Sequence, residues 1–252
     1  MLNNKKILVA GAAGLLGSSL VCRLLDEGAQ VVAVDLEEAR LLDRLSASGY
    51  STNPGLTVCA MDIGRKADVV DFFSNTHGLD GAVNCAYPRN KQYGRGFFEV
   101  ELEDFNDNVS MHLGSSFLFI QECARYFKRS QREFSLVNIS SVYGVIPPKF
   151  EVYEGTPMTM PVEYAAIKSA LIHLSKYVTT FVADSRFRSN CVSPGGIRDK
   201  QPEAFLSRYK SSCLGKGMLD IEDVLGTIVF LLSDQSRYVN GQNIVVDDGF
   251  TL

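Results

Sequence analysis

The sequence has no closely spaced cysteine pair, no long apolar run and no excess of basic residues. Its cysteines contain no C-x-x-C pair, which argues against a cysteine metal site or a disulfide scaffold and fits a reducing compartment. No run approaches the about 18 apolar residues that a membrane span needs. The first apolar run stops at Gly11 and is too short for a signal peptide. We therefore expect a cytoplasmic protein with no metal and no membrane segment.

Charge and composition narrow the class further. Lys and Arg number 25 against 29 Asp and Glu, for a net charge of −4, so a nucleic-acid-binding surface is not expected. The 252 residues are 46% hydrophobic, which suffices for a sizeable core. There is no internal repeat, low-complexity tract or linker. We predict one domain, residues 1–252, with a cofactor half at about 1–135 and a catalytic half at about 136–252.

Short apolar runs alternate with helical patterns along the whole chain. The predicted helices include 14–27, 105–129, 163–183 and 222–233. The runs predicted as buried strands are 6–11, 30–35, 56–62, 81–86, 134–141, 188–195 and 242–249. Unbroken apolar strands separated by helices indicate a parallel sheet covered on both faces. The fold class is therefore α/β, a Rossmann-type doubly wound sheet in three layers.

A glycine motif follows the first predicted strand, in "ILVAGAAGLLG". Gly11 permits a tight turn, Gly14 lets the backbone approach a pyrophosphate, and Gly17 permits close packing of helix on strand. Asp35 ends the next strand, where a carboxylate binds ribose hydroxyls and repels a 2′-phosphate. The motif predicts NAD, with NADP disfavoured by Asp35. The alternative is that the glycines serve only a turn and Asp35 only caps a strand.

Asp62 ends the third predicted strand. A carboxylate at that position suits a contact to the adenine amino group. It could equally be the N-cap of the following helix, and the sequence leaves both interpretations open.

Two Tyr-x-x-x-Lys matches occur, Tyr87 with Lys91 and Tyr164 with Lys168. In a helix this spacing places both side chains on one face. Pro88 follows Tyr87 directly and disfavours helix there, whereas Tyr164 opens a long amphipathic pattern without a breaker. Only the second pair has the geometry that the chemistry needs.

Carbonyl reduction needs a proton donor at the oxygen, and alcohol oxidation needs a base. A free phenol has a pKa near 10 and is a poor base at neutral pH, but a nearby cation such as Lys168 stabilises the phenolate of Tyr164. "NISS" supplies a serine hydroxyl at a strand end to polarise the reacting oxygen. Taken alone, Ser140 and Ser141 would be turn residues.

At this point the chain resembles the short-chain dehydrogenase/reductase family, in its compact single-domain branch. The resemblance covers essentially the whole chain and rests on "GAAGLLG", "AVNCA", "VNISS", "YAAIK", "VSPGGI" and "YVNGQNIVVDDG". It implies hydride transfer with a nicotinamide cofactor, with Tyr164 as acid/base, Lys168 as its electrostatic partner and Ser141 as the carbonyl-orienting hydroxyl. It implies cofactor contacts from Tyr164 and Lys168 and from Gly11, Gly14, Leu15, Leu16, Gly17, Asp35, Leu36, Asp62, Ile63, Asn84, Cys85, Ala86, Pro194, Gly195 and Ile197.

Several positions depart from the family pattern. The glycine spacing is closer to that of the larger sugar-nucleotide branch. Tyr87 stands where the family usually has a glycine and crowds that turn, and Asp199 stands where it often has a threonine. The family's catalytic asparagine is replaced in register by His112, with Asn108 one helical turn earlier. We predict that His112 relays protons in place of that asparagine; the alternative is a structural histidine.

The segment between Ser141 and Tyr164 is unusually long for the family. "IPPKFEVYEGTPMTMP" contains four prolines and is therefore predicted to be a loop. Its ends are tied to two catalytic residues, so we expect it to lie over the substrate pocket and set specificity. A surface loop without substrate contact is the alternative.

Basic residues in the loops of the same sheet edge favour an anionic substrate. They are Arg89, Lys91, Arg95, Lys149, Arg198 and Lys200. The chain also resembles family members linked to flagellin-modifying, nonulosonic acid sugar biosynthesis. We therefore predict an NAD-dependent oxidoreductase that interconverts a secondary alcohol and a ketone on a sugar-like, anionic small molecule. The alternatives are a non-catalytic NAD(H)-binding sensor and a sugar-nucleotide dehydratase or epimerase.

Apolar faces on 105–129 and 163–183 predict a homodimer or homotetramer.

Overall fold

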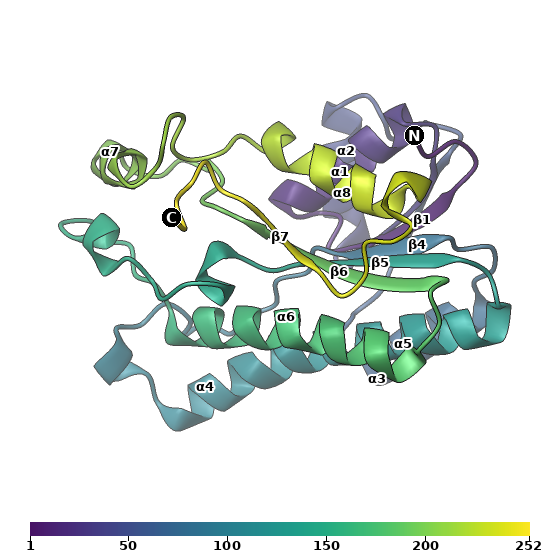
Figure 1. Cartoon of the computed structure of the whole chain (residues 1–252), viewed down its shortest axis with the longest axis horizontal. Helices are drawn as coiled ribbons and strands as arrows, with labels where there is room; N and C mark the ends of the chain where they lie inside the picture. The colour runs from purple at the N-terminus through teal and green to yellow at the C-terminus, as the bar shows by residue number, and fades with distance from the viewer.

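A computed structural model describes all residues, 1–252, and shows a parallel sheet between two layers of helices (Figure 1). The strand order is β3-β2-β1-β4-β5-β6-β7, with every neighbouring pair parallel. The chain starts at β1 in the middle, moves out to β3, returns, and moves out again to β7. The strands are β1 Lys6–Ala10, β2 Gln30–Asp35, β3 Leu56–Ala60, β4 Gly81–Asn84, β5 Phe134–Ile139, β6 Phe187–Pro194 and β7 Asn243–Val246.

Helices cover both faces of this sheet (Figure 1). One layer holds α1 Leu15–Asp26, α2 Glu38–Ala47 and α8 Glu222–Leu232, and the other holds α3 Lys66–Asn75, α5 Ser115–Ser130 and α6 Val162–Val182. Two further helices, α4 Leu102–Asn108 and α7 Glu203–Ser211, lie toward the carboxyl ends of the strands. The predicted Rossmann-type, three-layer fold in one domain is confirmed.

Two of the strands predicted to be buried are only partly so. β3 and β7 are the outer strands of the sheet, and their residues are half-buried or exposed. An edge strand has a neighbour on one side only, so apolar composition alone cannot distinguish it from a central strand.

The helix predicted over 105–129 is interrupted. α4 ends at Asn108, residues Val109–Gly114 form a π-helical segment, and α5 then begins at Ser115. Such segments are rare and frequently occur at functional sites. His112 lies within this segment and is its buried residue.

Apolar side chains form one core on each face of the sheet and a smaller third core beyond its carboxyl end. The third core consists of Val142, Tyr143, Val152, Phe205, Tyr209, Met218 and Phe250. It joins the long segment after β5 to α7 and to the last residues of the chain, which lie together at the left of Figure 1.

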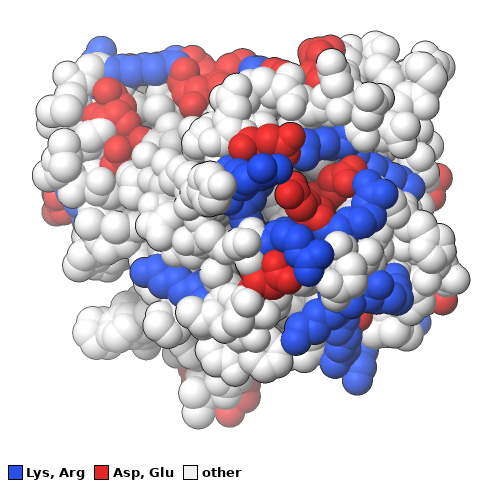
Figure 2. Space-filling view, turned by 45° about the vertical axis from the view of Figure 1, so that its right-hand side comes forward, with Lys and Arg blue, Asp and Glu red and all other residues white.

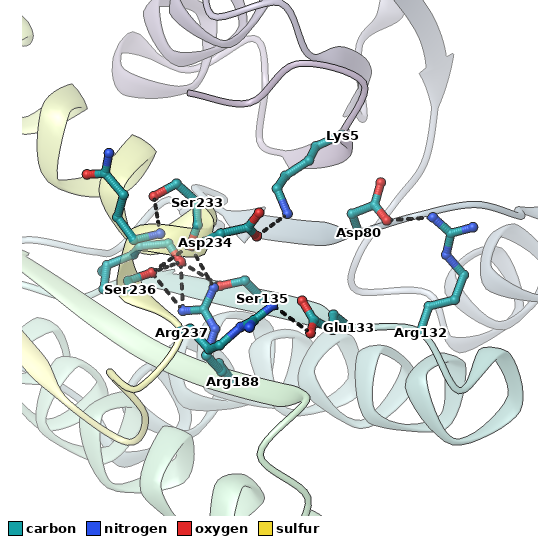
Figure 3. A network of polar contacts seen from close by, with 12 residues as sticks. Lys5, Asp80, Arg132, Glu133, Ser135, Arg188, Ser233, Asp234, Ser236 and Arg237 are labelled. Atoms are coloured by element: carbon teal, nitrogen blue, oxygen red, sulfur yellow. Dashed lines mark hydrogen bonds and ion pairs between the residues drawn. The ribbon is translucent and has the colours of Figure 1, made fainter.

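The amino end of the sheet is closed by a polar network (Figure 3). The buried Arg188 guanidinium donates to the carbonyl oxygens of Leu231 and Ser233 and to the Ser236 hydroxyl, at 2.9 to 3.3 Å. Around it, Arg237 pairs with Glu133, and further ion pairs join Lys5 to Asp234 and Arg132 to Asp80. Figure 2 brings this end forward and shows basic and acidic side chains alternating around a hollow. The bond from Arg188 of β6 to Leu231 of α8 holds this helix on the sheet. Each cation of the network already has a protein partner, so we interpret the network as structural.

None of the helices combines the length and the apolar character needed to cross a membrane.

Candidate active site

The two serines of "NISS" lie at the carboxyl end of β5 and do different things. Ser140 donates its hydroxyl proton to the carbonyl oxygen of Lys168 at 2.9 Å, which ties the strand end to α6. Ser141 accepts a hydrogen bond from the Tyr143 N–H at 3.2 Å, so its own proton is free to donate elsewhere. Of the two serines, only Ser141 can polarise a neighbouring oxygen.

Tyr164 and Lys168 stand one turn apart at the start of α6, and the Lys168 side chain reaches the last residue of β5. The Lys168 Nζ atom lies 5.5 Å from the centroid of the Tyr164 ring and donates to the carbonyl oxygen of Ile139 at 2.8 Å. The structure thus brings Ser141, Tyr164 and Lys168 to one sheet edge. Tyr87 and Lys91 lie outside any helix, as their sequence indicated.

Burial shifts the protonation equilibria of both groups. It lowers the pKa of Lys168 to about 8, and the buried Lys168 side chain therefore remains largely charged at neutral pH. Burial raises the pKa of the Tyr164 phenol, while interaction with the Ser141 hydroxyl partly opposes that rise. A phenol that holds its proton in this way is suited to donate it to a reacting oxygen.

His112 faces the same site from the π-helical segment. Its ring packs edge to face on the Tyr87 ring, with centroids 5.1 Å apart. Burial, with a smaller effect of the Lys168 charge, lowers the pKa of His112 to about 2, so the imidazole is neutral at ordinary pH. Asn108 is not free for a similar role because its amide is bonded to Asn90 and Glu163.

Tyr87 is the site residue whose position the sequence did not reveal. Its ring packs edge to face on the Tyr164 ring at 5.6 Å and on the Tyr93 ring at 5.8 Å, and the hydroxyls of Tyr87 and Tyr93 are hydrogen-bonded. The Lys168 Nζ atom lies 5.5 Å from the Tyr87 ring centroid. The replacement of a glycine by Tyr87 was visible in the sequence, but the direction of its side chain was not.

The glycine motif has the geometry of a dinucleotide cradle. Gly11 has φ = +76°, and a Cβ atom there would come within 2.6 Å of the Ala86 backbone. A Cβ atom on Gly17 would come within 2.2 Å of the Gly11 carbonyl oxygen. The Asp35 carboxylate accepts a hydrogen bond from the Ala13 N–H at 2.8 Å, which fixes the loop between strand and helix. The residues present therefore fit a dinucleotide. The helix α1 begins within the motif, at Leu15, as in sites that bind phosphates at a helix N-terminus.

The other predicted cofactor positions lie along the same edge. Leu36 is exposed beyond β2, Asn84 at the end of β4 donates to the Ser116 hydroxyl, and Ile197 pairs with Leu219. Asp62 accepts a hydrogen bond from the Gly64 N–H at 2.8 Å and stabilises a turn. The N-cap of α3 is Arg65, so the helix N-cap interpretation of Asp62 is wrong. Of the remaining positions, Leu16 lies in the first turn of α1, and Ile63, Cys85, Pro194 and Gly195 lie at or just beyond the carboxyl ends of β3, β4 and β6.

The long segment after Ser141 is ordered and tied down on both sides. Val152 is buried in the third core, and the Thr159 hydroxyl donates to the Gly94 carbonyl oxygen of the segment that follows β4. The segment thereby joins loops from β4, β5 and β6 at one edge of the sheet. A hollow of about 790 Å³ lies elsewhere, lined mainly by residues of β3 and α3.

Comparisons with known proteins agree with this arrangement. The family model described as enoyl-(acyl carrier protein) reductase matches residues 11–251. Post-translational flagellin modification protein A of Campylobacter coli is 37% identical over the full length of both chains. The 7alpha-hydroxysteroid dehydrogenase of Bacteroides fragilis is 27% identical over 99% of this chain and 95% of its own. A short-chain dehydrogenase of Leptospira borgpetersenii, solved with bound NAD+, is 29% identical with a TM-score of 0.88, covering 100% of this chain and 94% of its own.

Proposed function

The chain belongs to the short-chain dehydrogenase/reductase family and is a nicotinamide-dependent oxidoreductase acting on CH–OH groups; we propose that it uses NAD to interconvert a secondary alcohol and a ketone on a sugar-like, anionic molecule. The observation that carries this proposal is the convergence of Ser141, Tyr164 and Lys168 at one sheet edge beside the glycine cradle. We further propose that residues up to about 135 bind the cofactor and that the rest carry catalysis and substrate binding.

In this proposal Tyr164 transfers the proton at the reacting oxygen. When bound, the nicotinamide ring supplies the hydride in reduction and accepts it in oxidation. The Tyr164 hydroxyl donates its proton to the carbonyl oxygen, or takes one from the alcohol in the reverse direction. The Lys168 ammonium stabilises the phenolate that donation leaves behind, and the Ser141 hydroxyl holds the same substrate oxygen in place.

We propose that His112 carries the proton onward from this group. Because the pKa of His112 is low, the ring does not hold a second proton at ordinary pH. The neutral ring would pass a proton by taking it at one nitrogen while releasing another from the second nitrogen. Its buried position beside Tyr87, in a π-helical segment, supports this role. If His112→Asn leaves the pH–rate profile unchanged, the relay proposal is wrong.

The preference for NAD over NADP rests on Asp35. A carboxylate at the end of β2 accepts hydrogen bonds from the adenosine ribose and repels a 2′-phosphate. Its hydrogen bond with the Ala13 N–H holds it beside the glycine cradle, where the ribose would lie. The chain's own residues thus support NAD.

A sugar-like substrate is supported by the relationship to a flagellin modification protein and by the Tyr, Thr and Glu residues of the long segment that ends at Tyr164. We also propose a cytoplasmic homodimer or homotetramer, because α6 exposes an apolar pair, Tyr177 and Phe181, that would be covered in an assembly.

The test is oxidation of NADH, followed by absorbance, with a panel of oxidised sugar phosphates, uronic acids and nucleotide sugars. We expect turnover of at least one member, and a loss of about 10²–10⁴-fold in kcat for Tyr164→Phe with NADH binding retained. Tyr238→Phe, at the opposite end of the sheet, is the matched control and should keep full activity. Binding of NADH without Tyr164-dependent turnover of any candidate would favour a non-catalytic sensor.

A further inference from the structure

The segment that follows β4, residues 87–95, is held in one conformation by side chains from other elements. The Asn108 Oδ1 atom accepts the Asn90 N–H at 2.9 Å, and the Asn108 Nδ2 atom donates to Asn90 Oδ1 at 3.2 Å. Asp104 accepts from Asn90 Nδ2 at 3.1 Å and pairs with Arg95 at 3.1 Å. This segment is therefore anchored at its middle and toward its end, unlike an ordinary surface loop.

Asn108 also joins the segment to the catalytic helix. Its Nδ2 atom donates to Oε1 of Glu163 at 3.2 Å, and Glu163 directly precedes Tyr164 in α6. Both side chains are 1% exposed, and the other carboxyl oxygen of Glu163 has no protein partner. A buried polar pair of this kind is retained where it fixes one geometry. Asn108 thus fixes the 87–95 segment relative to Tyr164.

Arg89 is the cation that this segment brings to the catalytic group. The Arg89 Cζ atom lies 4.9 Å from the centroid of the Tyr87 ring, and the Tyr87 ring in turn contacts the Tyr164 ring. A guanidinium over the face of a tyrosine ring is attracted by the negative potential of that face, which favours one orientation. Arg89 is exposed and makes no salt bridge with any carboxylate.

Three other basic residues of the neighbouring loops, Lys91, Arg95 and Lys149, differ from Arg89 in their surroundings. Arg95 is neutralised by Asp104, and Lys149 donates to the Phe250 carbonyl oxygen at 2.7 Å. Lys91 lies two residues after Arg89 in the sequence, but the cations over the Tyr87 and Tyr164 rings are Arg89 and Lys168. Among these cations, only Arg89 is free of a partner and joined to Tyr164 through a single ring.

We propose that Arg89, oriented by Tyr87, is the residue that binds the anionic group of the substrate, a carboxylate or a phosphate. This inference rests on the proposed function and deepens it by naming the recognition residue. A guanidinium offers a planar fork of N–H donors that matches either group. Because Tyr87 already orients it and Asn108 holds the segment, less conformational freedom is lost when the anion binds.

The experiment measures binding and not turnover. Glucose, glucuronate and glucose 6-phosphate are titrated by calorimetry into the full-length protein saturated with NADH. We expect at least one anion to bind about tenfold or more tightly than glucose, and the better anion to identify a carboxylate or a phosphate site. Arg89→Met should abolish that difference, Arg89→Lys should keep part of it, and Lys91→Met should keep all of it.

Tyr87 is tested as the positioning residue through the same difference. Tyr87→Phe keeps the ring under Arg89 and should keep most of the anion preference, whereas Tyr87→Leu should lose most of it. The inference is overturned if the anions and glucose bind alike to the wild type, if neither anion binds, or if the preference survives in Arg89→Met. The proposed function fails separately, on Tyr164-dependent oxidation of NADH.

Discussion

The Tyr87 ring packs edge to face against the Tyr164 ring, with 5.6 Å between their centroids. Tyr87 thus covers one side of the phenol that we propose as the acid/base, and burial is the main reason why the pKa of Tyr164 is raised. Removing the covering ring should admit water. We predict that Tyr87→Ala lowers the pKa of Tyr164.

The midpoint is measured by the ultraviolet absorbance of tyrosinate during an alkaline titration. Each protein is compared with the same protein carrying Tyr164→Phe, so the difference reports Tyr164 alone. Tyr238→Ala, which removes an exposed ring at the far end of the sheet, should leave the midpoint in place. A midpoint that stays or rises in Tyr87→Ala would contradict the prediction.

His112 should make folding sensitive to acid. Its pKa is lowered to about 2 in the folded protein, against an ordinary value of about 6.5, so the unfolded chain takes up a proton that the folded chain refuses. The contribution of His112 to the free energy of unfolding is complete above about pH 6.5 and decreases as the pH falls below that value. At pH 5 the decrease amounts to about 2 kcal/mol. His112→Asn should reduce the fall in the free energy of unfolding between pH 7 and pH 5. Urea denaturation measures it, with His173→Asn, an exposed histidine on α6, as the control.

Asp35→Asn separates two functions of the Asp35 side chain, the hydrogen bond that it accepts from the Ala13 N–H and the negative charge that it carries. The amide oxygen of asparagine can still accept the hydrogen bond from the Ala13 N–H, but the negative charge that repels a 2′-phosphate is gone. We expect the ratio of NADH to NADPH affinity to fall by about tenfold or more, equivalent to about 1.4 kcal/mol. Fluorescence titration with both nucleotides checks it, and an unchanged ratio would remove Asp35 as the determinant.

Arg188 should be the most costly residue of the amino-end network to replace (Figure 3). Arg188→Met removes three buried hydrogen bonds made by a charged donor, which should cost about 2–4 kcal/mol of stability even though Ser135 and Ser236 still donate to the Leu231 and Ser233 carbonyl oxygens. Arg237→Met breaks only an exposed pair with Glu133 and should cost less than about 1 kcal/mol. Equal losses in urea denaturation would show that the network is not centred on Arg188.

Tyr177 and Phe181 should lie in an interface between copies of the chain. Their rings are stacked on α6 and are 61% and 64% exposed, an unusual exposure for a neighbouring aromatic pair. Replacing both by glutamate should reduce the oligomer to a smaller species in light scattering. Tyr238→Glu changes a residue that is 92% exposed at the other end and should leave the mass unchanged.

The sequence predicts the sheet and its helices well, because burial on two faces leaves a plain pattern of apolar runs. β2 matches its predicted range, and the other strands differ only at their ends. The edge position of β3 and β7 was not predictable in this way, since it depends on which strands lack a neighbour. The π-helical segment at 109–114 was missed for a similar reason, because no proline or other breaker marks it.

The catalytic group was predicted through spacing, since Tyr164 and Lys168 lie one helical turn apart. The contacts around Asn108 could not be predicted, because they join residues from three places that are far apart in the chain. Nothing in "EYAAIK" distinguishes Glu163 from an ordinary solvent-exposed glutamate at the start of a helix. Only the folded chain shows that it is buried against Asn108.

The third core has a consequence for attempts to transfer specificity between relatives. Val152 of the long segment packs in one cluster with Tyr209 of α7 and with Phe250, whose ring stacks on Tyr209 at 4.2 Å. A grafted segment would meet a surface shaped for other side chains and would lose its packing. Residues 142–161, α7 and the stretch around Phe250 therefore form one exchangeable cassette, and a chimera should need all three parts together.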